Sequence, residues 1–242
     1  MRAGFDGFPR EAMTFFRGLA RHNQREWFLE HKDVYEESVK RPMTELVEAL
    51  NGALMEFAPA CVTDPPKAVY RIYRDTRFSA DKTPYKDRVA ASFWRRGMHK
   101  HAAAGYYFGV SPKEVEVGGG IYLPPPETLA SMRRHLGAHH EEFRRLVGVK
   151  QLRTLLGDIQ GQRLARVPKG FPAGHPAEDL LRLKQCYLYT TLDPAIATTP
   201  KLFTELVKRF RAMTPLIEFL NAPLVAANRR QRQDGTLPLM RI

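Results

Sequence analysis

Cysteine and long apolar stretches are both scarce in this 242-residue chain. Its two cysteines, Cys61 and Cys186, lie far apart and form no CxxC pair. This usage argues against a disulfide scaffold and a zinc ribbon, and it fits a reducing cytoplasm. No apolar run approaches the roughly 20 residues that span a bilayer, and the first residues lack the apolar region of a secretory signal. We therefore expect a cytoplasmic protein without a membrane partner.

Motifs for nucleotides, hydrolytic triads and metals are also missing. No GxGxxG or Walker pattern opens a helix, and no GxSxG pattern marks a nucleophilic serine. Two histidine pairs, His99 with His101 and His139 with His140, have no obvious cysteine or carboxylate partners at metal-binding spacing. We therefore expect neither a metal nor a cofactor.

Positive charge, by contrast, is abundant. The formal net charge is +12 and the pI is about 9.9, a balance that favours anionic partners such as nucleic acid or phosphorylated metabolites. Arg outnumbers Lys by 26 to 12, a bias that GC-rich codon usage alone could produce. The position of the charge is therefore more informative than its total. Residues 67–100 hold ten basic and three acidic side chains, so +7 of the +12 lies in this segment.

Hydrophobic spacing predicts helices in both halves of the chain. A first helix begins near Pro9, and Asn23 with Glu26 three residues later is typical of a capping box that opens a second helix. Apolar residues at spacings of three and four predict a helix over residues 39–57, which Pro42 kinks or restarts. Further apolar stripes predict helices around residues 129–136, 143–147, 152–156 and 202–220.

Strands are expected between these helices. Alternating, β-rich sequence predicts strands at residues 68–73, 88–94, 105–110, 114–122 and 183–192, with loops at 58–67 and 166–176. The short link 111–113 implies an antiparallel hairpin, and Gly118, Gly119 and Gly120 suggest a bulge or a close backbone approach. The order of elements predicts an α+β fold, a mainly antiparallel sheet flanked by N-terminal and C-terminal helices. We expect one domain over residues 5–227 and a basic tail over 228–242.

The densest motif is RIYRDTRFSADKTPYK, residues 71–86. It resembles the signature of the domain-of-unknown-function 2461 family of bacterial and fungal proteins. Three more blocks resemble blocks of that family: ARHNQREWFLEHKDVYEESVKRP, GYYFGVSPKEVEVGGGIYLPPPETLASMR and RVPKGFPAGHP. The resemblance extends over about residues 5–222 and implies a single domain, but it implies no particular activity.

The same motif predicts an anion-binding site. Guanidinium groups bind phosphate and carboxylate in a bidentate manner, and lysine adds a mobile positive charge. Asp75 and Asp81 are candidates to orient these cations, or to act catalytically as a general base if a pKa is raised. The predicted ligand-binding residues are Arg71, Arg74, Arg77, Lys82, Tyr85 and Lys86.

Three functions are left open by the sequence. The first is binding of an anionic, phosphorylated or carboxylated small molecule, with or without catalysis, which requires these side chains to converge in a concave pocket. The second is nucleic-acid binding, in which aromatic rings stack on bases beside the cations; the candidate rings are Tyr70, Tyr73, Phe78, Tyr85, Phe93 and Trp94. The third is a non-catalytic interaction module, in which arginines and aspartates form an ion-pair network that holds the loop. The ligand, any reaction and the oligomeric state are not specified.

Overall fold

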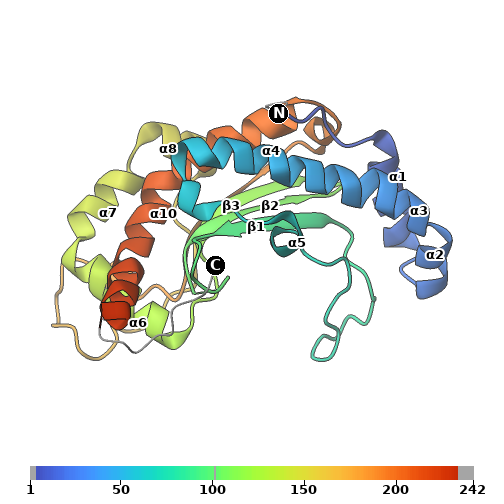
Figure 1. The fold of residues 1–242 in the computed structure, drawn as a ribbon. Coiled ribbons are helices and arrows are strands. Elements are labelled where there is room, and N and C mark those ends of the chain that lie inside the picture. Colours follow the sequence, from blue (N-terminus) through green and yellow to red (C-terminus); the bar gives the residue numbers. More distant parts are fainter. Residues whose placement is uncertain (1–3, 101, 234–242) are drawn as a thin grey trace. The chain divides into compact units, whose positions relative to one another are not determined.

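The computed structural model describes residues 4–100 and 102–233. Helices and a four-stranded sheet confirm the predicted α+β class (Figure 1). By their internal contacts, the residues form two compact units that alternate along the sequence. Unit 1 lies within residues 1–96, 106–118 and 190–211, and unit 2 within 97–105, 119–189 and 212–242. The expected extent of a single domain, residues 5–227, stays a prediction.

Unit 1 begins with a series of helices. The first begins directly after Pro9, as predicted, and buries Met13, Phe16 and Leu19 on one face. A π-helical turn precedes the fourth helix, whose second residue is Pro42; this proline has no N–H to donate, so the helix restarts here as predicted. The bounds are α1 (Arg10–Arg21), α2 (Arg25–Glu30), α3 (Lys32–Val34), the π-helical turn (Tyr35–Lys40) and α4 (Arg41–Phe57).

The expected loop over residues 58–67 contains two short helical pieces. A 3-10 turn spans Pro59–Cys61, and α5 spans Pro65–Ala68. Prolines at the first positions of both pieces supply the backbone angle that a helical turn needs without the loss of a useful donor. The prediction of an irregular segment is therefore wrong at these two places.

The four strands lie in the order β1-β2-β3-β4, so each strand pairs with its neighbour in sequence. The link at residues 111–113 is a tight hairpin, in which Ser111 N–H donates to the Glu114 carbonyl at 3.1 Å. Gly120 has a φ of +134°, and a side chain there would collide with the backbone of Cys186 and Tyr187, which confirms the close backbone approach. The bounds are β1 (Val89–Trp94), β2 (Gly105–Val110), β3 (Val115–Ile121) and β4 (Cys186–Leu192).

Alternation along β2 separates an apolar face from a polar face. Tyr106 and Phe108 are buried, and the Tyr106 and Phe93 rings lie 4.9 and 5.8 Å from the ring of Phe210 in α10 (Lys201–Gln233). Tyr107, the residue between them, contacts the side chain of Glu116 instead. The core of unit 1 therefore lies on the Tyr106 side, and the opposite side holds polar groups.

The segment between α5 and β1, residues 69–88, is termed the basic loop. In Figure 1 it extends away from β1 as two long arms joined at a tip. The predicted strand over residues 68–73 is wrong, because only two isolated antiparallel bridges connect the arms, Val69 with Ala91 and Tyr73 with Tyr85. Three residues separate the bridges on one arm (70–72) and five on the other (86–90). The two extra residues interrupt the ladder as a bulge does.

Unit 2 contains the helices that follow β3. Its loop over residues 166–176 is irregular, as predicted, whereas the short α9 is not anticipated by the sequence pattern. Arg133 ties α6 to the segment before β4, since its Nε and Nη2 atoms donate to the Leu183 carbonyl at 3.2 and 3.0 Å. The bounds are α6 (Pro126–Ala138), α7 (His140–Val147), α8 (Lys150–Leu156) and α9 (Glu178–Leu181).

The last helix, α10, is longer than expected. It includes Pro215 and Pro223 and continues to Gln233. Residues 228–233, which the sequence assigns to the basic tail, are therefore helical, and the rest of the predicted tail, 234–242, lies outside the described residues. No helix within residues 4–100 and 102–233 has both the length and the apolar content required to cross a membrane.

Candidate functional site

The basic loop is anchored by Asn23, which lies in the short link between α1 and α2. The Asn23 side chain donates to the Tyr85 carbonyl at 2.9 Å and accepts from the Tyr85 N–H at 3.0 Å. The N-cap position of α2 is Gln24, and no side chain caps it, so the predicted capping box is wrong. Asn23 instead satisfies backbone groups that lie 62 residues away in sequence.

The Tyr85 side chain completes this anchor. The side chain is buried, and its ring stacks on Phe28 of α2 with centroids 4.3 Å apart. Burial raises the pKa of the Tyr85 hydroxyl, so this hydroxyl keeps its proton at neutral pH. Tyr85, one of the predicted ligand-binding residues, therefore packs in the core of unit 1 and holds the loop in place.

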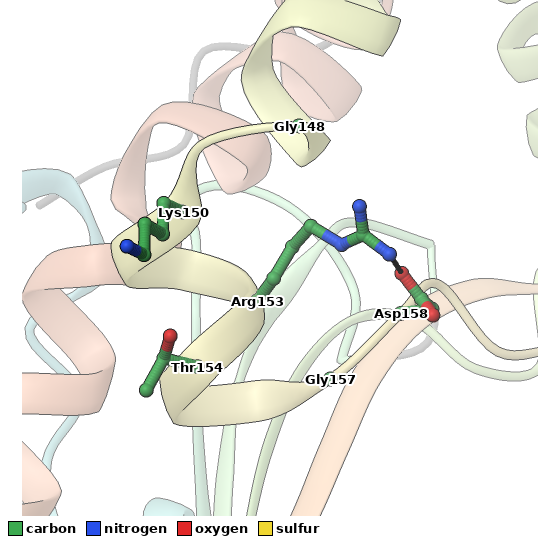
Figure 2. A pocket seen from close by; sticks show the side chains of 6 residues that line it. All are labelled: Gly148, Lys150, Arg153, Thr154, Gly157 and Asp158. Atoms are coloured by element: carbon green, nitrogen blue, oxygen red, sulfur yellow. Dashed lines mark ion pairs between the residues drawn. The ribbon is translucent and has the colours of Figure 1, made fainter.

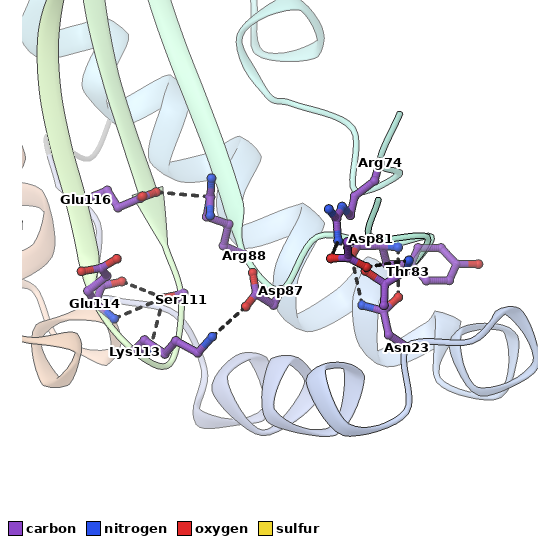
Figure 3. A network of polar contacts seen from close by, with 11 residues as sticks. Asn23, Arg74, Asp81, Thr83, Asp87, Arg88, Ser111, Lys113, Glu114 and Glu116 are labelled. Carbon is purple, nitrogen blue, oxygen red and sulfur yellow. Dashed lines mark hydrogen bonds and ion pairs between the residues drawn. The ribbon is translucent and has the colours of Figure 1, made fainter. Parts of the chain in front are cut away.

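The outer part of the basic loop is built from ion pairs between the predicted residues. Arg77 binds Asp75 in a bidentate manner, with Nε and Nη2 donating to the two carboxylate oxygens at 3.0 and 2.8 Å. Arg74 pairs with Asp81 and also donates to the Thr83 hydroxyl (Figure 3). Each arginine of the outer loop thus has a carboxylate partner within the same loop.

Both carboxylates are held in the charged form. The hydrogen bond from Arg77 lowers the pKa of Asp75, and the hydrogen bond from Arg74, followed by bonds from Thr83, lowers the pKa of Asp81 to about 2. A carboxylate with a depressed pKa is a weak proton acceptor at neutral pH. This geometry favours an orienting role for both aspartates, and their catalytic role stays a prediction.

Two lysines of the motif bind carbonyl groups instead of carboxylates. Lys82 Nζ donates across the outer loop to the Thr76 carbonyl at 2.9 Å. Lys86 Nζ donates to the Arg71 carbonyl at 2.6 Å and lies 5.7 Å from the centre of the Tyr70 ring. Among the described side chains, Arg71, Lys82 and Lys86 form no ion pair with a carboxylate.

Arg71, Lys86 and Arg88 form a second group at the bulge, here termed the cation cluster. Burial lowers the pKa of Lys86, and the positive charges of Arg71 and Arg88 lower it further. Two members of the cluster, Lys86 and Arg88, lie between the two bridges on the longer arm, which has five residues there instead of three. The irregular backbone therefore brings three like charges within electrostatic range of one another.

A buried carboxylate on the neighbouring strands supports this cluster. Glu116 in β3 is largely buried, and its carboxylate accepts a hydrogen bond from the Tyr107 hydroxyl at 2.8 Å. The same carboxylate pairs with Arg88 Nε at 3.2 Å (Figure 3). Burial and the nearby Glu116 charge raise the pKa of Tyr107 above its usual range, so Tyr107 remains a donor. Gly109 leaves space for this pair, because a Cβ atom there would overlap the Glu116 carboxylate.

Tyr107 and Glu116 were not among the residues that the sequence predicted. A signal for them exists, because alternation places Tyr107 and Gly109 on the same face of β2, while Glu116 interrupts the apolar residues Val115 and Val117. A carboxylate within a buried strand needs a partner.

The predicted residues thus fall into two groups and do not converge in one pocket. The outer loop holds Arg74, Asp75, Arg77, Asp81 and Lys82, whereas Arg71 and Lys86 lie with Arg88 at the bulge. An open depression of about 420 Å³ lies elsewhere, in unit 2, against α8 (Figure 2). None of the predicted residues lines it; its lining residues are Gly148, Lys150, Arg153, Thr154, Gly157 and Asp158.

The histidine pairs give no metal site in the part of the chain that the structure describes, where no three His, Cys, Asp or Glu side chains are grouped around a common point. His101 lies outside the described residues. The His139 ring contacts His135 of the same helix end, with centroids 4.6 Å apart, and the His140 ring lies 6.1 Å from that of His175.

These observations define an α+β protein with a long basic loop that is anchored on a pair of N-terminal helices. Residues 11–219 match the family described as Conserved hypothetical protein (DUF2461), which confirms the resemblance seen in the motifs. The match extends over most of the chain, so the protein belongs to the DUF2461 family. The comparison with curated proteins found no match.

Proposed function

We propose that the protein binds an anionic small molecule, phosphorylated or carboxylated, at the cation cluster. The observation that supports this proposal most directly is that the half-buried Lys86 lies within electrostatic range of the positive charges of Arg71 and Arg88. Like charges held close together raise the free energy of the folded protein. An anion bound among them removes that repulsion, so the cluster favours a negatively charged ligand.

The ion pairs of the basic loop favour the cation cluster over the outer loop as the site that binds an anion. Arg74 and Arg77 already have the carboxylates of Asp81 and Asp75 as partners. A ligand at those arginines has to compete with a directly paired carboxylate, whereas Arg71 and Lys86 form no ion pair among the described side chains and the charge of Arg71 reaches Asp75 only at longer range. Arg71 is exposed and Lys86 is half-buried, so both are accessible to a small solute.

The surrounding groups suit an anion of modest size. Glu116 fixes Arg88 from the buried side, and the Tyr70 and Tyr107 rings meet edge to face with centroids 6.3 Å apart. A fixed guanidinium loses little side-chain entropy when it binds a ligand. We propose no reaction and no cofactor, because the aspartates of the loop are held as charged partners of arginine.

Ligand-induced thermal stabilisation tests this proposal. The purified protein is screened with inorganic phosphate, sugar phosphates, mononucleotides and dicarboxylates. A ligand at about 100 times its Kd adds roughly 2.7 kcal/mol to the free energy of unfolding. For a chain of this size, that raises the melting temperature by about 5–10 °C.

Charge-neutral variants then locate the site. Arg71→Gln and Lys86→Gln are each expected to weaken the affinity for the active anion by about tenfold or more, since each removes a charge-assisted hydrogen bond. Lys150→Gln is the matched control, because it removes one positive charge at the depression in unit 2. The proposal would be contradicted if both loop variants kept their affinity or if Lys150→Gln lost as much affinity as they did. It would also be contradicted if no anion stabilised the protein.

A further inference from the structure

The tip of the basic loop presents an aromatic side chain to solvent. Phe78 has an exposed fraction of 94%, the highest among the large hydrophobic residues that the structure describes, whereas the other exposed large hydrophobic residues range from 38% to 59%. Single exposed hydrophobic side chains are ordinary on protein surfaces. Phe78 is distinguished by its place midway along the projecting basic loop and by the guanidinium beside its ring.

Hydrogen bonds within the tip restrain the backbone on both sides of Phe78. Arg77 is held by two hydrogen bonds to Asp75, and the backbone N–H of Arg77 donates to the same carboxylate at 3.3 Å. Lys82 Nζ joins the two sides of the tip through the Thr76 carbonyl. A loop that is already ordered loses less entropy on binding, so the ion-pair network increases the affinity that a single exposed ring provides.

One cation lies beside this ring. The Arg77 guanidinium lies 5.7 Å from the centre of the Phe78 ring. Tyr73, five residues earlier on the same arm, is 52% exposed. Residues 69–88 contain six arginines and lysines and three aspartates, so the loop carries a net charge of +3. Aromatic rings interleaved with cations bind single-stranded nucleic acid, because bases stack on the rings while phosphates pair with the cations.

From these contacts we infer that the basic loop also binds single-stranded nucleic acid, with a base stacked on Phe78 and a phosphate group of the strand at the cation cluster. The inference rests on the proposed function, because it assigns a substrate class to the same cluster. Phe78 lies seven residues from Arg71 along the first arm, a distance of at most about 25 Å in an extended chain. A strand of several nucleotides is long enough to contact both places.

Charge and composition favour this occupant over a lipid surface. The tip has one large apolar side chain, and Asp75 and Asp81 lie on either side of it. Insertion into a bilayer needs a larger apolar area and places both carboxylates near anionic headgroups. Stacking needs only one flat ring with cations beside it.

Fluorescence anisotropy with labelled 12-nucleotide single strands of DNA and RNA tests the inference. Phe78→Ala is expected to weaken binding about 5- to 150-fold, the range for loss of one stacked base, while Phe78→Trp retains it. Phe78→Leu, which is apolar but not aromatic, is expected to lose affinity as alanine does. Leu29→Ala, at another exposed apolar side chain of unit 1, serves as the control and is expected to bind as the unaltered protein does.

The dependence on salt gives a second readout. Three cations of the loop, Arg71, Lys82 and Lys86, have no carboxylate partner among the described side chains. With about three phosphates neutralised, the logarithm of the binding constant is expected to fall with the logarithm of salt concentration with a slope of about −2. Lys86→Gln is expected to reduce the magnitude of that slope by about 0.7.

The outcomes separate this inference from the proposed function. If phosphate or a mononucleotide binds in a Lys86-dependent manner but no oligonucleotide binds at 50 mM salt, the inference is wrong and the proposed function stands. If Phe78→Ala binds oligonucleotides normally, or Phe78→Leu retains full affinity, no base stacks on Phe78 and the inference is wrong. If the protein binds vesicles of anionic phospholipid through Phe78 and no oligonucleotide, the occupant is a membrane and the inference is overturned. If nothing anionic binds, both proposals fail.

Discussion

Asn23 and Tyr85 are joined by two hydrogen bonds, one to the N–H and one to the carbonyl of Tyr85, at 3.0 and 2.9 Å. The bridge between Tyr73 and Tyr85 explains why these groups are available. Arg74 N–H donates to the Pro84 carbonyl and Lys86 N–H donates to the Ile72 carbonyl, so Tyr73 and Tyr85 form a non-hydrogen-bonded pair. In that register the N–H and carbonyl of Tyr85 point away from the other arm, toward Asn23.

Removal of the Asn23 amide is expected to destabilise unit 1. Asn23→Ala leaves the partly buried N–H and carbonyl of Tyr85 without their partner, at a cost of about 2–4 kcal/mol in the free energy of unfolding. Urea denaturation measures the loss. Gln24→Ala is the control, because Gln24 occupies the N-cap position without a side-chain capping bond. If the two variants lose equal stability, the Asn23–Tyr85 contact contributes nothing beyond a surface substitution.

Alanine at Gly109 is expected to displace the buried Glu116 carboxylate. A Cβ atom at this position would overlap the Glu116 carboxylate and lie 3.0 Å from the Tyr107 hydroxyl, so Gly109→Ala forces the buried pair apart. We expect a loss of about 1–3 kcal/mol, as for an overpacked core.

The control for this prediction is Gly52→Ala in α4. A Cβ atom at Gly52 meets nothing within 4 Å, and alanine in a helix is favoured over glycine by about 0.5–1 kcal/mol. The two substitutions are therefore expected to have opposite signs in thermal unfolding. A stabilising Gly109→Ala variant would show that Tyr107 and Glu116 can separate freely.

The sequence predicts the regular elements well, because each depends on local periodicity. Apolar residues at helical spacing define α1 and α4, and alternation defines β1, β2 and β3 within one or two residues. The short α5 and α9 were missed, since four residues are too few to show a period.

The basic loop shows where local reasoning fails. The alternating residues 68–73 resemble a strand, but a ladder needs equal numbers of residues on both arms, and the five-residue stretch 86–90 faces only three. The register of two distant arms is a tertiary property that composition does not encode. For the same reason the sequence identified Arg71 and Lys86 but separated them from Arg88, Tyr107 and Glu116, which the sheet brings to them.

His135 is expected to make unit 2 sensitive to acid. Burial lowers its pKa, and the nearby ring of His139 lowers it further, although Glu142 and a backbone contact from Phe219 oppose this. Because the folded-state pKa is below the ordinary value, the unfolded chain binds the proton more tightly. Stability is therefore fully present above the ordinary histidine pKa and falls as the pH is lowered through it toward the folded-state value. Urea midpoints between pH 8 and pH 5 are expected to fall less in His135→Gln than in the unaltered protein, and equal slopes would contradict this.

Lys86 gives a direct test of the cation cluster by NMR titration of lysine side-chain carbons. Its pKa is expected below the ordinary value of 10.5. Arg71→Gln is expected to raise the pKa but not to restore it fully, because burial is the largest cause of the shift. The control Lys150→Gln is expected to leave it unchanged.

A bound anion is expected to raise the pKa of Lys86, as Arg71→Gln does, because negative charge stabilises the ammonium form. Saturation with the active phosphate or carboxylate ligand therefore raises the pKa of Lys86, and binding at alkaline pH takes up a proton. The reverse linkage follows: affinity for the anion weakens as the pH rises through the Lys86 pKa. A Lys86 pKa of 10.5 without ligand would contradict the electrostatic coupling in the cation cluster. A Lys86 pKa that does not move on binding would show that the anion does not occupy the cluster.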